Sequence, residues 1–519
     1  MFLYPLTFWE PMAADEAASK ANSEGTSQTS VSSEKSQQAS EAQPKSSPRF
    51  FGSHQGQRHF QLRSENQTIG KAAYRWIETE ENFILEEESQ IKVTMMGMVQ
   101  RIQTRVALVL DFDRRIQSFD YMLRTGDSEA RIKGRRQAGK LRVEKDQANS
   151  RQSLDIEVSE SIVIGGPMIR LAALSQGLPP AGKEVKEMQV LMFEPSQLAV
   201  VPMKVQLRSS SQAGQFDLTL RYEGQEIHNR ISRDGNLLEE RMMIPPSLPV
   251  VATPLEPKAY ENLNIVASNF DLVEASRVAF PTIPNPKELR SLKVRVSGVN
   301  LNDFNFARHR QSLEGDLLEI RVEEIPDRSA PVQSLVGRND LSAYLQGDFF
   351  IPVQHPDIQR KAREIVGAES DLWKRARRIH DFVYQSLDKR PYISLPDAIE
   401  TLQSREGDCN EHAVLFTALA RAAGVPTRMV IGLVHSNTTM SFGDNSRPVE
   451  NRPGFYYHAW VEVFNGYEWI SMDPTWNQIP AGATHIALIE GSAAEQVKLV
   501  GLVGNLELSL VEIQRKSNL

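Results

Sequence analysis

The chain has 519 residues, of which 40% are hydrophobic and 24% charged, a composition typical of a globular protein with two to four domains. Its formal net charge of −7 argues against a nucleic-acid backbone as the main partner, because that affinity depends on clustered Lys and Arg. The single cysteine excludes an intramolecular disulfide, and no stretch of sequence is apolar for long enough to span a bilayer as a helix.

The first segment, residues 1–60, predicts a disordered tether. Met1–Trp9 is apolar but short, is interrupted by Pro5, and lacks the preceding Lys or Arg that begins a signal peptide. The residues after it are rich in Ser, Gln, Ala and Glu and cannot bury enough apolar surface to offset the entropy of ordering. We expect either a free end or the remnant of a membrane or signal segment. An extracytoplasmic or membrane-tethered location is favoured over the cytoplasm.

Residues 61–250 predict a β-rich domain, because apolar and polar residues alternate along most of this stretch. The alternation is clearest in the run Phe216, Leu218, Leu220 and Tyr222. The pair Asp234-Gly235 lies between two such runs and indicates a tight hairpin. We expect a large antiparallel sheet, either curved or sandwiched.

A cluster of prolines after residue 244 marks a boundary, and residues 251–339 predict a smaller β-rich or linker domain. Residues 340–495 mix helix and strand patterns, and residues 496–519 form a C-terminal strand or tail. One helix is predicted by apolar residues at spacings of four and three, namely Leu372, Ala376, Ile379, Val383 and Leu387. The expected fold class is therefore multidomain, with a β-rich N-terminal region followed by an α+β domain.

The cysteine lies at the predicted start of a second helix. Asp408 and Glu411 have the spacing of a capping box, with Asp408 as N-cap, so Cys409 takes the first helical position. The unpaired N–H groups and partial positive charge of a helix N-terminus favour the thiolate, which is the reactive form of cysteine. The same N–H groups can stabilise an oxyanion. The alternative is a buried structural cysteine.

A hairpin predicts the partners of this nucleophile. Residues 455–464 read as a strand, Asn465-Gly466 as a two-residue turn, and residues 467–473 as the return strand. In that register His458 faces Asp473, and directly opposed Cβ atoms lie about 4.5–5.5 Å apart. A carboxylate at that distance can bind one imidazole nitrogen and leave the other free for a thiol. The alternative is a core histidine that is satisfied by a nearby acid.

Together these residues resemble the transglutaminase-like superfamily, whose catalytic domain has a papain-like fold. The resemblance covers residues 340–492 and rests on the motifs Gly407-Asp408-Cys409-Asn410-Glu411, Ala423-Gly424-Val425-Pro426-Thr427-Arg428, His458-Ala459-Trp460-Val461-Glu462 and Asp473-Pro474-Thr475. It implies Cys409 as nucleophile, His458 as general base and Asp473 as the orienting acid. The second oxyanion donor stays open, with Trp373 and Tyr392 as candidates. The large β-rich extension is similar to bacterial chains of this type, and the calcium dependence of animal transglutaminases is not implied.

The reaction that the resemblance implies is acyl transfer at a peptide or glutamine carboxamide through a thioester. With water as acceptor the protein is a protease or amidase, and with an amine it is a cross-linking transglutaminase. We favour hydrolysis, because water is always available and no dedicated amine site is recognisable. A non-catalytic module that binds peptide or lipid through the β-rich region is an alternative of a different class.

The expected partner is a protein or peptide substrate, and membrane association through the N-terminus stays open, as does the oligomeric state. No cofactor is expected. No metal is expected either, because no pair of histidines has convincing ligand spacing in the sequence.

Overall fold

The structure is a computed structural model of the chain. It describes residues 56–126, 128–147, 150–158, 161–179, 185–195, 198–222, 225–244, 248–269, 271–304, 306–325, 328–390, 397–438, 452–491 and 505–516. Most of the expected tether, residues 1–55, lies outside these ranges.

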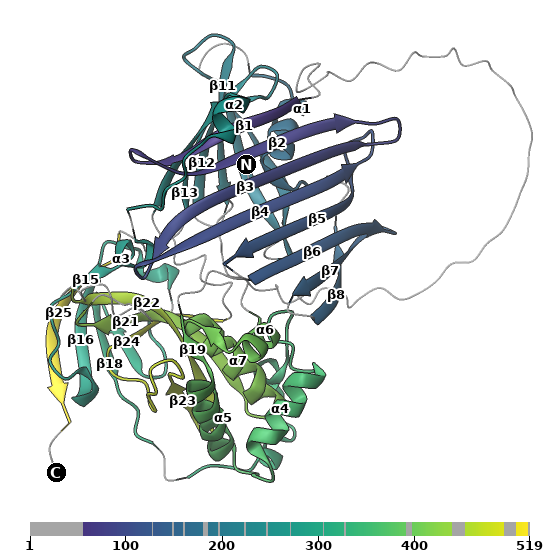
Figure 1. Ribbon diagram of the computed structural model, residues 1–519. Coiled ribbons are helices and arrows are strands. Elements are labelled where there is room, and N and C mark those ends of the chain that lie inside the picture. The colour runs from purple at the N-terminus through teal and green to yellow at the C-terminus, as the bar shows by residue number, and fades with distance from the viewer. Residues whose placement is uncertain are drawn as a thin grey trace, which may run out of the picture.

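Fourteen strands of the described residues form one antiparallel sheet, called the large sheet below (Figure 1). Its order is β8-β7-β6-β5-β4-β3-β2-β1-β14-β13-β12-β11-β10-β9, so two meanders meet where β1 pairs with β14. The strands are β1 (Gly56–Ser64), β2 (Gln67–Glu78), β3 (Phe83–Met95), β4 (Met98–Leu110), β5 (Ile116–Thr125), β6 (Ser128–Gln137), β7 (Lys140–Gln147), β8 (Ser150–Glu157), β9 (Val185–Glu194), β10 (Ala199–Ser209), β11 (Gln215–Tyr222), β12 (Gln225–Ser232), β13 (Leu237–Ile244) and β14 (Leu248–Leu255). The expected large antiparallel sheet is confirmed.

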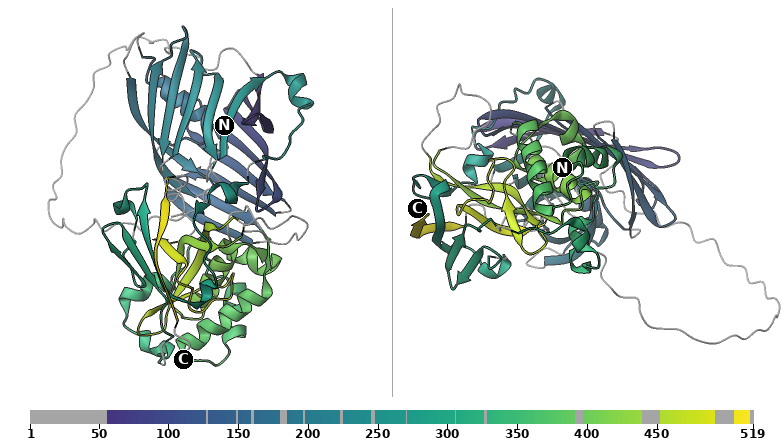
Figure 2. Two further views of the ribbon diagram at one scale, coloured as in Figure 1. Left: turned by 90° about the vertical axis from the view of Figure 1, so that its left-hand side faces the viewer. Right: turned by 90° about the horizontal axis from the view of Figure 1, so that it is seen from below.

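The large sheet bends so that its two halves share one apolar core (Figure 2). Alternation along the strands produces this inner face, since every second residue of β11 is buried. Phe119 of β5 lies 5.3 Å from Phe193 of β9, measured between ring centroids, although the two strands are far apart in the sheet order. The edge strands β8 and β9 are consecutive in the chain, and α1 (Gly165–Ser175) links them and packs into the same core.

Three smaller sheets follow. The central sheet has the order β15-β22-β21-β24, with β23 paired to β22, and the small sheet has the order β17-β18-β16-β25. Two short strands, β19 and β20, pair in parallel. Their bounds are β15 (Val278–Ala279), β16 (Leu289–Ser297), β17 (Gln311–Glu314), β18 (Leu317–Arg321), β19 (Asp388–Lys389), β20 (Glu406–Gly407), β21 (Thr427–Ser436), β22 (Gly454–Phe464), β23 (Trp469–Met472), β24 (His485–Glu490) and β25 (Glu507–Arg515).

Helices α4 to α7 gather beside the central sheet, below the large sheet in Figure 1. Helix α7 contacts β22, β21 and all three of the other helices, so it is the centre of this packing. The remaining helices are α2 (Pro257–Glu261), α3 (Leu272–Ala275), α4 (Pro356–Val366), α5 (Leu372–Ser386), α6 (Ala398–Ser404) and α7 (Cys409–Ala422). Within the described ranges, every helix is too short or too polar to cross a membrane.

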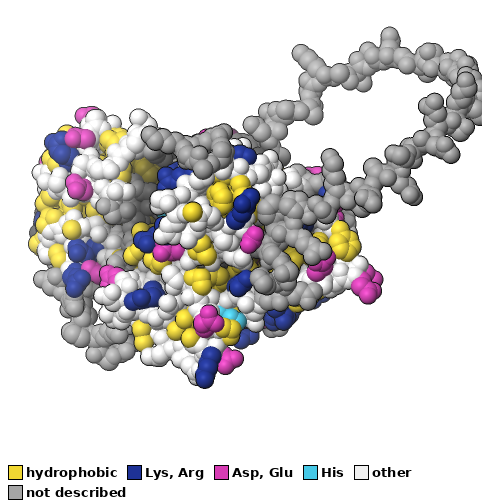
Figure 3. Space-filling model, turned by 90° about the horizontal axis from the view of Figure 1, so that it is seen from above, with side chains coloured by type: hydrophobic (Ala, Val, Ile, Leu, Met, Phe, Trp, Pro, Cys, Tyr) yellow, Lys and Arg dark blue, Asp and Glu magenta, His cyan; other side chains and the backbone are white. Residues whose placement is uncertain are grey.

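The C-terminal strand β25 pairs with β16, so the end of the chain completes the small sheet. Strand β14 continues to Leu255, past the expected limit at residue 250. The domain limits of the sequence analysis stay predictions. On the face seen from above, basic and acidic side chains are interspersed with apolar ones (Figure 3).

A buried ion pair joins the large sheet to the helices that carry the candidate site. Lys145 Nζ of β7 lies 2.7 Å from Asp397 Oδ2, and the side chains are 2% and 3% exposed. Asp397 is also the N-cap of α6, where its Oδ1 accepts from the backbone N–H groups of Ile399 and Glu400. The rings of Phe349 and Phe350 lie beside the ammonium group, so water is largely excluded from the pair.

We expect Lys145→Met to lower the free energy of unfolding by about 3–5 kcal/mol, because it leaves a buried carboxylate without its counter-ion. Urea unfolding followed by tryptophan fluorescence measures the effect. Lys140→Met in the same strand is the matched control, since the Lys140–Glu157 pair is exposed and contributes little. Equal shifts in the two variants would contradict the prediction.

Candidate active site

Helix α7 begins at Cys409, as the capping box predicts. The Asp408 side chain accepts from Asn410 N at 2.8 Å, and Glu411 Oε2 accepts from Asp408 N at 2.9 Å. Gly407 precedes the cap, and a Cβ there would lie 2.3 Å from the Cβ of Glu411. The capping box therefore needs glycine at this position. It holds Cys409 in the first turn of α7, where backbone N–H groups have no carbonyl partner within the helix.

Cys409 is only 9% exposed, and its helix α7 packs against β22. Burial raises the pKa of the Cys409 thiol well above 9.0, and the charges of Asp408, Glu411 and Asp473 add to the rise. A hydrogen bond from the backbone N–H of Ala459 acts in the opposite direction but is outweighed. The helix N-terminus alone favours the thiolate, but in the folded protein the resting form is the thiol.

The partner strand differs from the prediction in register. Phe464 pairs with Trp469 and Glu462 with Ser471, so the loop contains residues 465–468 rather than a two-residue turn. The side chain of Asn465 causes the difference, because its Oδ1 accepts from the backbone N–H groups of Tyr467 and Glu468 and stabilises a longer loop. The expected cross-strand pairing of His458 with Asp473 is therefore wrong.

His458 and Asp473 nevertheless meet, because β23 ends at Met472 and the chain then turns back. His458 Nε2 lies 2.9 Å from Asp473 Oδ2, and both side chains are fully buried. On the other side of His458, β21 presents Gly432, where a Cβ would overlap Ile486 O at 2.0 Å. Close approach of β21 to β24 at this glycine brings a third residue, His485, to the same carboxylate.

The Asp473 carboxylate is the centre of the site. Oδ2 accepts from His458 and, at 3.0 Å, from His485 Nε2, while Oδ1 accepts from the backbone N–H groups of Thr475 and Trp476. Burial alone would raise the pKa of Asp473, but the charge of His458 and the hydrogen bonds from both imidazoles outweigh it and hold the pKa well below 3.8. Asp473 is thus ionised.

An ionised carboxylate only accepts hydrogen bonds, so both imidazoles carry a proton on Nε2. Their Nδ1 atoms are then unprotonated in the neutral rings. Both Nδ1 atoms are buried and make no hydrogen bond within the described part of the chain. Burial lowers the pKa of His485 below 6.5, which keeps this second ring neutral. In its neutral form His458 therefore presents Nδ1 as a proton acceptor, and its neighbour Ala459 donates a backbone hydrogen bond to the thiol.

Two further histidines surround the site. His380 of α5 is buried, and its Nε2 lies 3.1 Å from the carbonyl oxygen of Asp473. His412, one turn beyond Cys409, bonds the carbonyl of Asp408 through Nδ1, and burial lowers its pKa to about 4. Neither ring reaches the carboxylate of Asp473, which fits a structural role.

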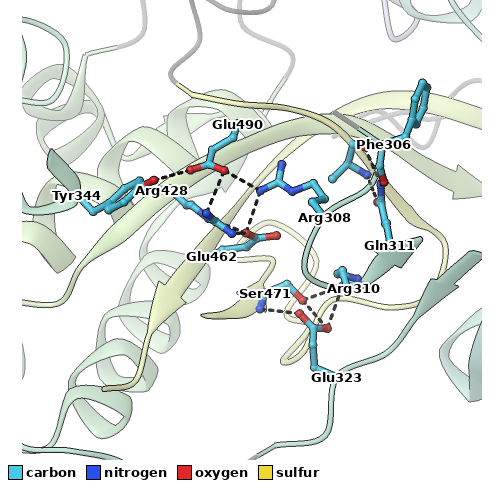
Figure 4. A network of polar contacts seen from close by, with 11 residues as sticks. Phe306, Arg308, Arg310, Gln311, Glu323, Tyr344, Arg428, Glu462, Ser471 and Glu490 are labelled. Atoms are coloured by element: carbon cyan, nitrogen blue, oxygen red, sulfur yellow. Dashed lines mark hydrogen bonds and ion pairs between the residues drawn. The ribbon is translucent and has the colours of Figure 1, made fainter. Parts of the chain in front are cut away.

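Arg310, just before β17, and Glu323, just after β18, meet at Ser471 (Figure 4) and brace the segment that carries Asp473 and His485. Arg310 donates to Ser471 Oγ at 2.7 Å, to the carbonyl of Ala481 at 2.8 Å and to the carbonyl of Gly482. Glu323 bonds both Ser471 and Arg310. These contacts fix the chain just before Asp473 and just before His485.

A second ionic network in Figure 4 joins the strands of the central sheet. Glu462 is fully buried and accepts from Arg428 at 2.7 Å and from Arg308 at 3.1 Å. Glu490 binds the same two arginines and the hydroxyl of Tyr344. Because β21, β22 and β24 each contribute one carboxylate or guanidinium, the network fixes their relative position.

Aromatic rings cover the histidines. The ring of Trp476 lies 5.0 Å from that of His458, and Trp460 lies 5.2 Å from His485, measured between centroids. Met96, at the tip of the hairpin between β3 and β4, packs with Tyr456 and Trp476. The large sheet therefore extends to the immediate surroundings of the site. Neither candidate oxyanion donor can be assigned, since Trp373 belongs to the helical core and Tyr392 lies outside the described residues.

His458, Asp473 and His485 are also close enough together to be metal ligands. One ligand atom each from His458, Asp473 and His485 lies within 4.8 Å of the others. In the hydrogen-bonded state both Nε2 atoms are protonated, so a metal ion would have to displace two protons and two charge-assisted hydrogen bonds. The three residues therefore fit a carboxylate hydrogen-bonded by two imidazoles better than a metal centre.

Comparison with known proteins gives the class of this region. Residues 359–474 match the transglutaminase-like superfamily. A search of curated proteins found no match to the chain. Among solved structures, a candidate cysteine protease from Cytophaga hutchinsonii is similar at 15% identity with a TM-score of 0.27, covering 44% of this chain and 86% of that one. A candidate protease from Parabacteroides distasonis is similar at 9% identity with a TM-score of 0.20, covering 60% and 72%.

The chain therefore contains a transglutaminase-like domain, and Cys409, His458 and Asp473 all fall within the matched residues. The expected family resemblance and the expected fold class are confirmed. The structural likenesses have low TM-scores and assign no reaction to this chain. His485 lies beyond the match, and sequence reasoning missed it together with Arg310 and Trp476. Only the Asp-Pro-Thr-Trp run could have indicated Trp476 from sequence.

We expect the alkylation of Cys409 by iodoacetamide to stay slow through neutral pH and to accelerate only above pH 9, because burial raises the pKa of the thiol. The same chain in urea should titrate near the free-thiol value of about 8.5. His458→Ala should leave the pH at which alkylation accelerates unchanged, because the resting thiol forms no ion pair with this imidazole. A fast plateau below neutral pH that is lost in His458→Ala would instead reveal a thiolate–imidazolium pair.

We expect His485→Leu to lower the free energy of unfolding at pH 7 by about 1–3 kcal/mol, because Asp473 loses one hydrogen-bond donor. The depressed pKa of Asp473 contributes stability above its unfolded pKa, and this contribution is lost as pH falls through the folded pKa. The defect should therefore shrink in acid, as urea unfolding at several pH values can measure. His485→Gln keeps a donor and should lose less; equal losses that do not change with pH would contradict the prediction.

Proposed function

We propose that the transglutaminase-like domain is a cysteine-dependent acyl-transfer enzyme that acts on peptide or glutamine carboxamides. The observation that carries this proposal is the Nδ1 of His458, which has no hydrogen-bond partner among the described residues. The ring is oriented by Asp473, and His458 is the neighbour of the residue that hydrogen-bonds Cys409. A buried structural cysteine needs no such acceptor. A nucleophile with its base and orienting acid does need one.

The first step transfers the acyl group to sulfur. As Cys409 Sγ attacks the carboxamide carbon, its proton passes to His458 Nδ1, so no free thiolate is needed in the resting enzyme. The imidazolium that forms is stabilised by the ionised Asp473. The backbone N–H of Cys409, which the Asp408 cap does not bond, is available to the oxyanion. When the C–N bond breaks, the proton goes from His458 to the departing amine and a thioester remains.

The second step hydrolyses the thioester and regenerates the free thiol of Cys409. A water molecule attacks the thioester carbon, its proton passes to His458 Nδ1, the C–S bond breaks, and the same proton returns to sulfur. The products are a carboxylic acid and the amine of the first step. We propose water as the acceptor. Transfer to an amine would use the same residues and give an amide in place of the acid.

We expect Cys409→Ala to abolish turnover, and His458→Gln and Asp473→Asn to lower kcat by about 10²–10⁴-fold, the usual contribution of a positioned base. Fluorescent casein, with new N-termini read by mass spectrometry, measures peptide hydrolysis. A glutamine-containing peptide with and without hydroxylamine separates release of ammonia from amine transfer, which gives a hydroxamate.

The exposed His228, in β12 of the large sheet, supplies the matched control as His228→Gln, which should leave kcat unchanged. If hydroxamate formed far in excess of free acid at low hydroxylamine, the acceptor would be an amine rather than water, and the proposed reaction would be cross-linking rather than hydrolysis. Turnover that survives in Cys409→Ala, or no covalent trapping of Cys409 by a peptide acyl electrophile, would favour a binding module without chemistry.

A further inference from the structure

The inner face of the large sheet carries polar side chains at positions where alternation requires core residues. Glu87 of β3, Asn229 of β12 and Glu240 of β13 each occupy an inward-facing position and are 3–4% exposed. Arg170 of α1 is 1% exposed in the same interior. Inward-facing neighbours of Glu87 are Leu85 and Ser89, so the strand does not change face there.

Several of these groups have no hydrogen-bond partner within the described part of the chain. All three guanidinium nitrogens of Arg170, both carboxyl oxygens of Glu87, both amide atoms of Asn229 and the hydroxyl of Tyr74 are buried and unsatisfied. Buried polar groups are nearly always hydrogen-bonded, and an unpaired buried charge is more costly still. So many unsatisfied atoms in one interior indicate that a group outside the described residues supplies their partners.

The groups form one cluster, defined here as the Arg170 cluster: Tyr74, Glu87, Arg170, Asn229 and Glu240. Tyr74 pairs with Glu87 across β2 and β3, and Arg170 lies 5.4 Å from the Tyr74 ring. Glu87 is close enough to Arg170 and Glu240 to feel both charges. Glu240 pairs with Asn229 across β13 and β12. The cluster therefore bridges the two halves of the large sheet through α1.

The donors of the cluster define the chemistry of a ligand. Arg170 is a permanent cation with five N–H donors in a planar fork that suits a carboxylate or phosphate. Burial raises the pKa of Glu87 to about 7, so a proton on this carboxyl is available as a further donor near neutral pH. Tyr74 and the Asn229 amide can donate as well. The apolar core of the large sheet, to which Tyr74 belongs, also contains Phe60, Leu85, Ile91, Met203 and Leu218.

We propose that the Arg170 cluster binds the anionic head group of a small amphiphile whose apolar body lies against the core of the large sheet. The shared chemistry is a carboxylate or phosphate on a hydrocarbon chain, as in a fatty acid or an alkyl phosphate. Arg170 contacts the head group, and Glu87, Tyr74 and Asn229 complete its hydrogen bonds. This binding is independent of Cys409 and of the proposed acyl transfer.

The test uses the purified full chain after delipidation and isothermal titration with dodecanoate, dodecyl phosphate and dodecanol. We expect saturable 1:1 binding of at least one anionic probe, at least about tenfold tighter than dodecanol, because the charge-assisted contacts are lost with the alcohol. The probe that binds tighter identifies the source as carboxylate or phosphate. Arg170→Met should weaken that probe by about tenfold or more and leave dodecanol unchanged.

Arg208→Met, at an exposed arginine of β10, is the matched control and should bind as the parent protein does. If Arg170→Met does not fold, the comparison of the anionic probes with dodecanol in the parent protein still tests the proposal. No saturable binding of either anion, equal affinity for the alcohol, or unchanged binding in a folded Arg170→Met would overturn the proposal and leave internal water as the partner. Peptide turnover should persist in every one of these outcomes, because the amphiphile site and the acyl transfer are independent proposals.

Discussion

The fully buried carboxylate of Asp473 is the constraint on which the site depends. It is ionised in an interior where a lone charge would be prohibitive, so its oxygens must be surrounded by donors. Two imidazoles and two backbone N–H groups meet this need. In doing so they fix the tautomer of His458, and with it the atom that can accept the proton of a thiol. One electrostatic requirement therefore orients the imidazole of His458.

The same requirement explains why the small sheet belongs to the site. A carboxylate that binds four donors needs the segment between Ser471 and His485 held in one conformation. Arg310 supplies this by bonding both ends of the segment from a distance of more than 160 residues in sequence. The Arg308–Arg428–Glu462–Glu490 network fixes the strands around it. The region that sequence alone predicts to be a smaller β-rich or linker domain is thus part of the architecture of the candidate site.

The large sheet also contacts the surroundings of the site directly. The Lys145–Asp397 pair anchors it to α6, and Met96 at its hairpin tip packs with the Trp476 ring that covers His458. These packed contacts join the large sheet to the elements that surround the site. The unsatisfied polar atoms of the Arg170 cluster give that interior a chemistry of its own.

Local sequence determined the elements whose cause is local. The capping box of Asp408 and Glu411 starts α7 at Cys409, and the alternation of apolar residues builds the large sheet, since both depend on neighbours within a few residues. The contact of His458 with Asp473 was also anticipated, although by the wrong register. Only the tertiary structure decided the protonation of Cys409 and the second donor, His485. Both depend on burial and on segments distant in sequence, because desolvation and Coulomb energy are set by everything that packs around a charge.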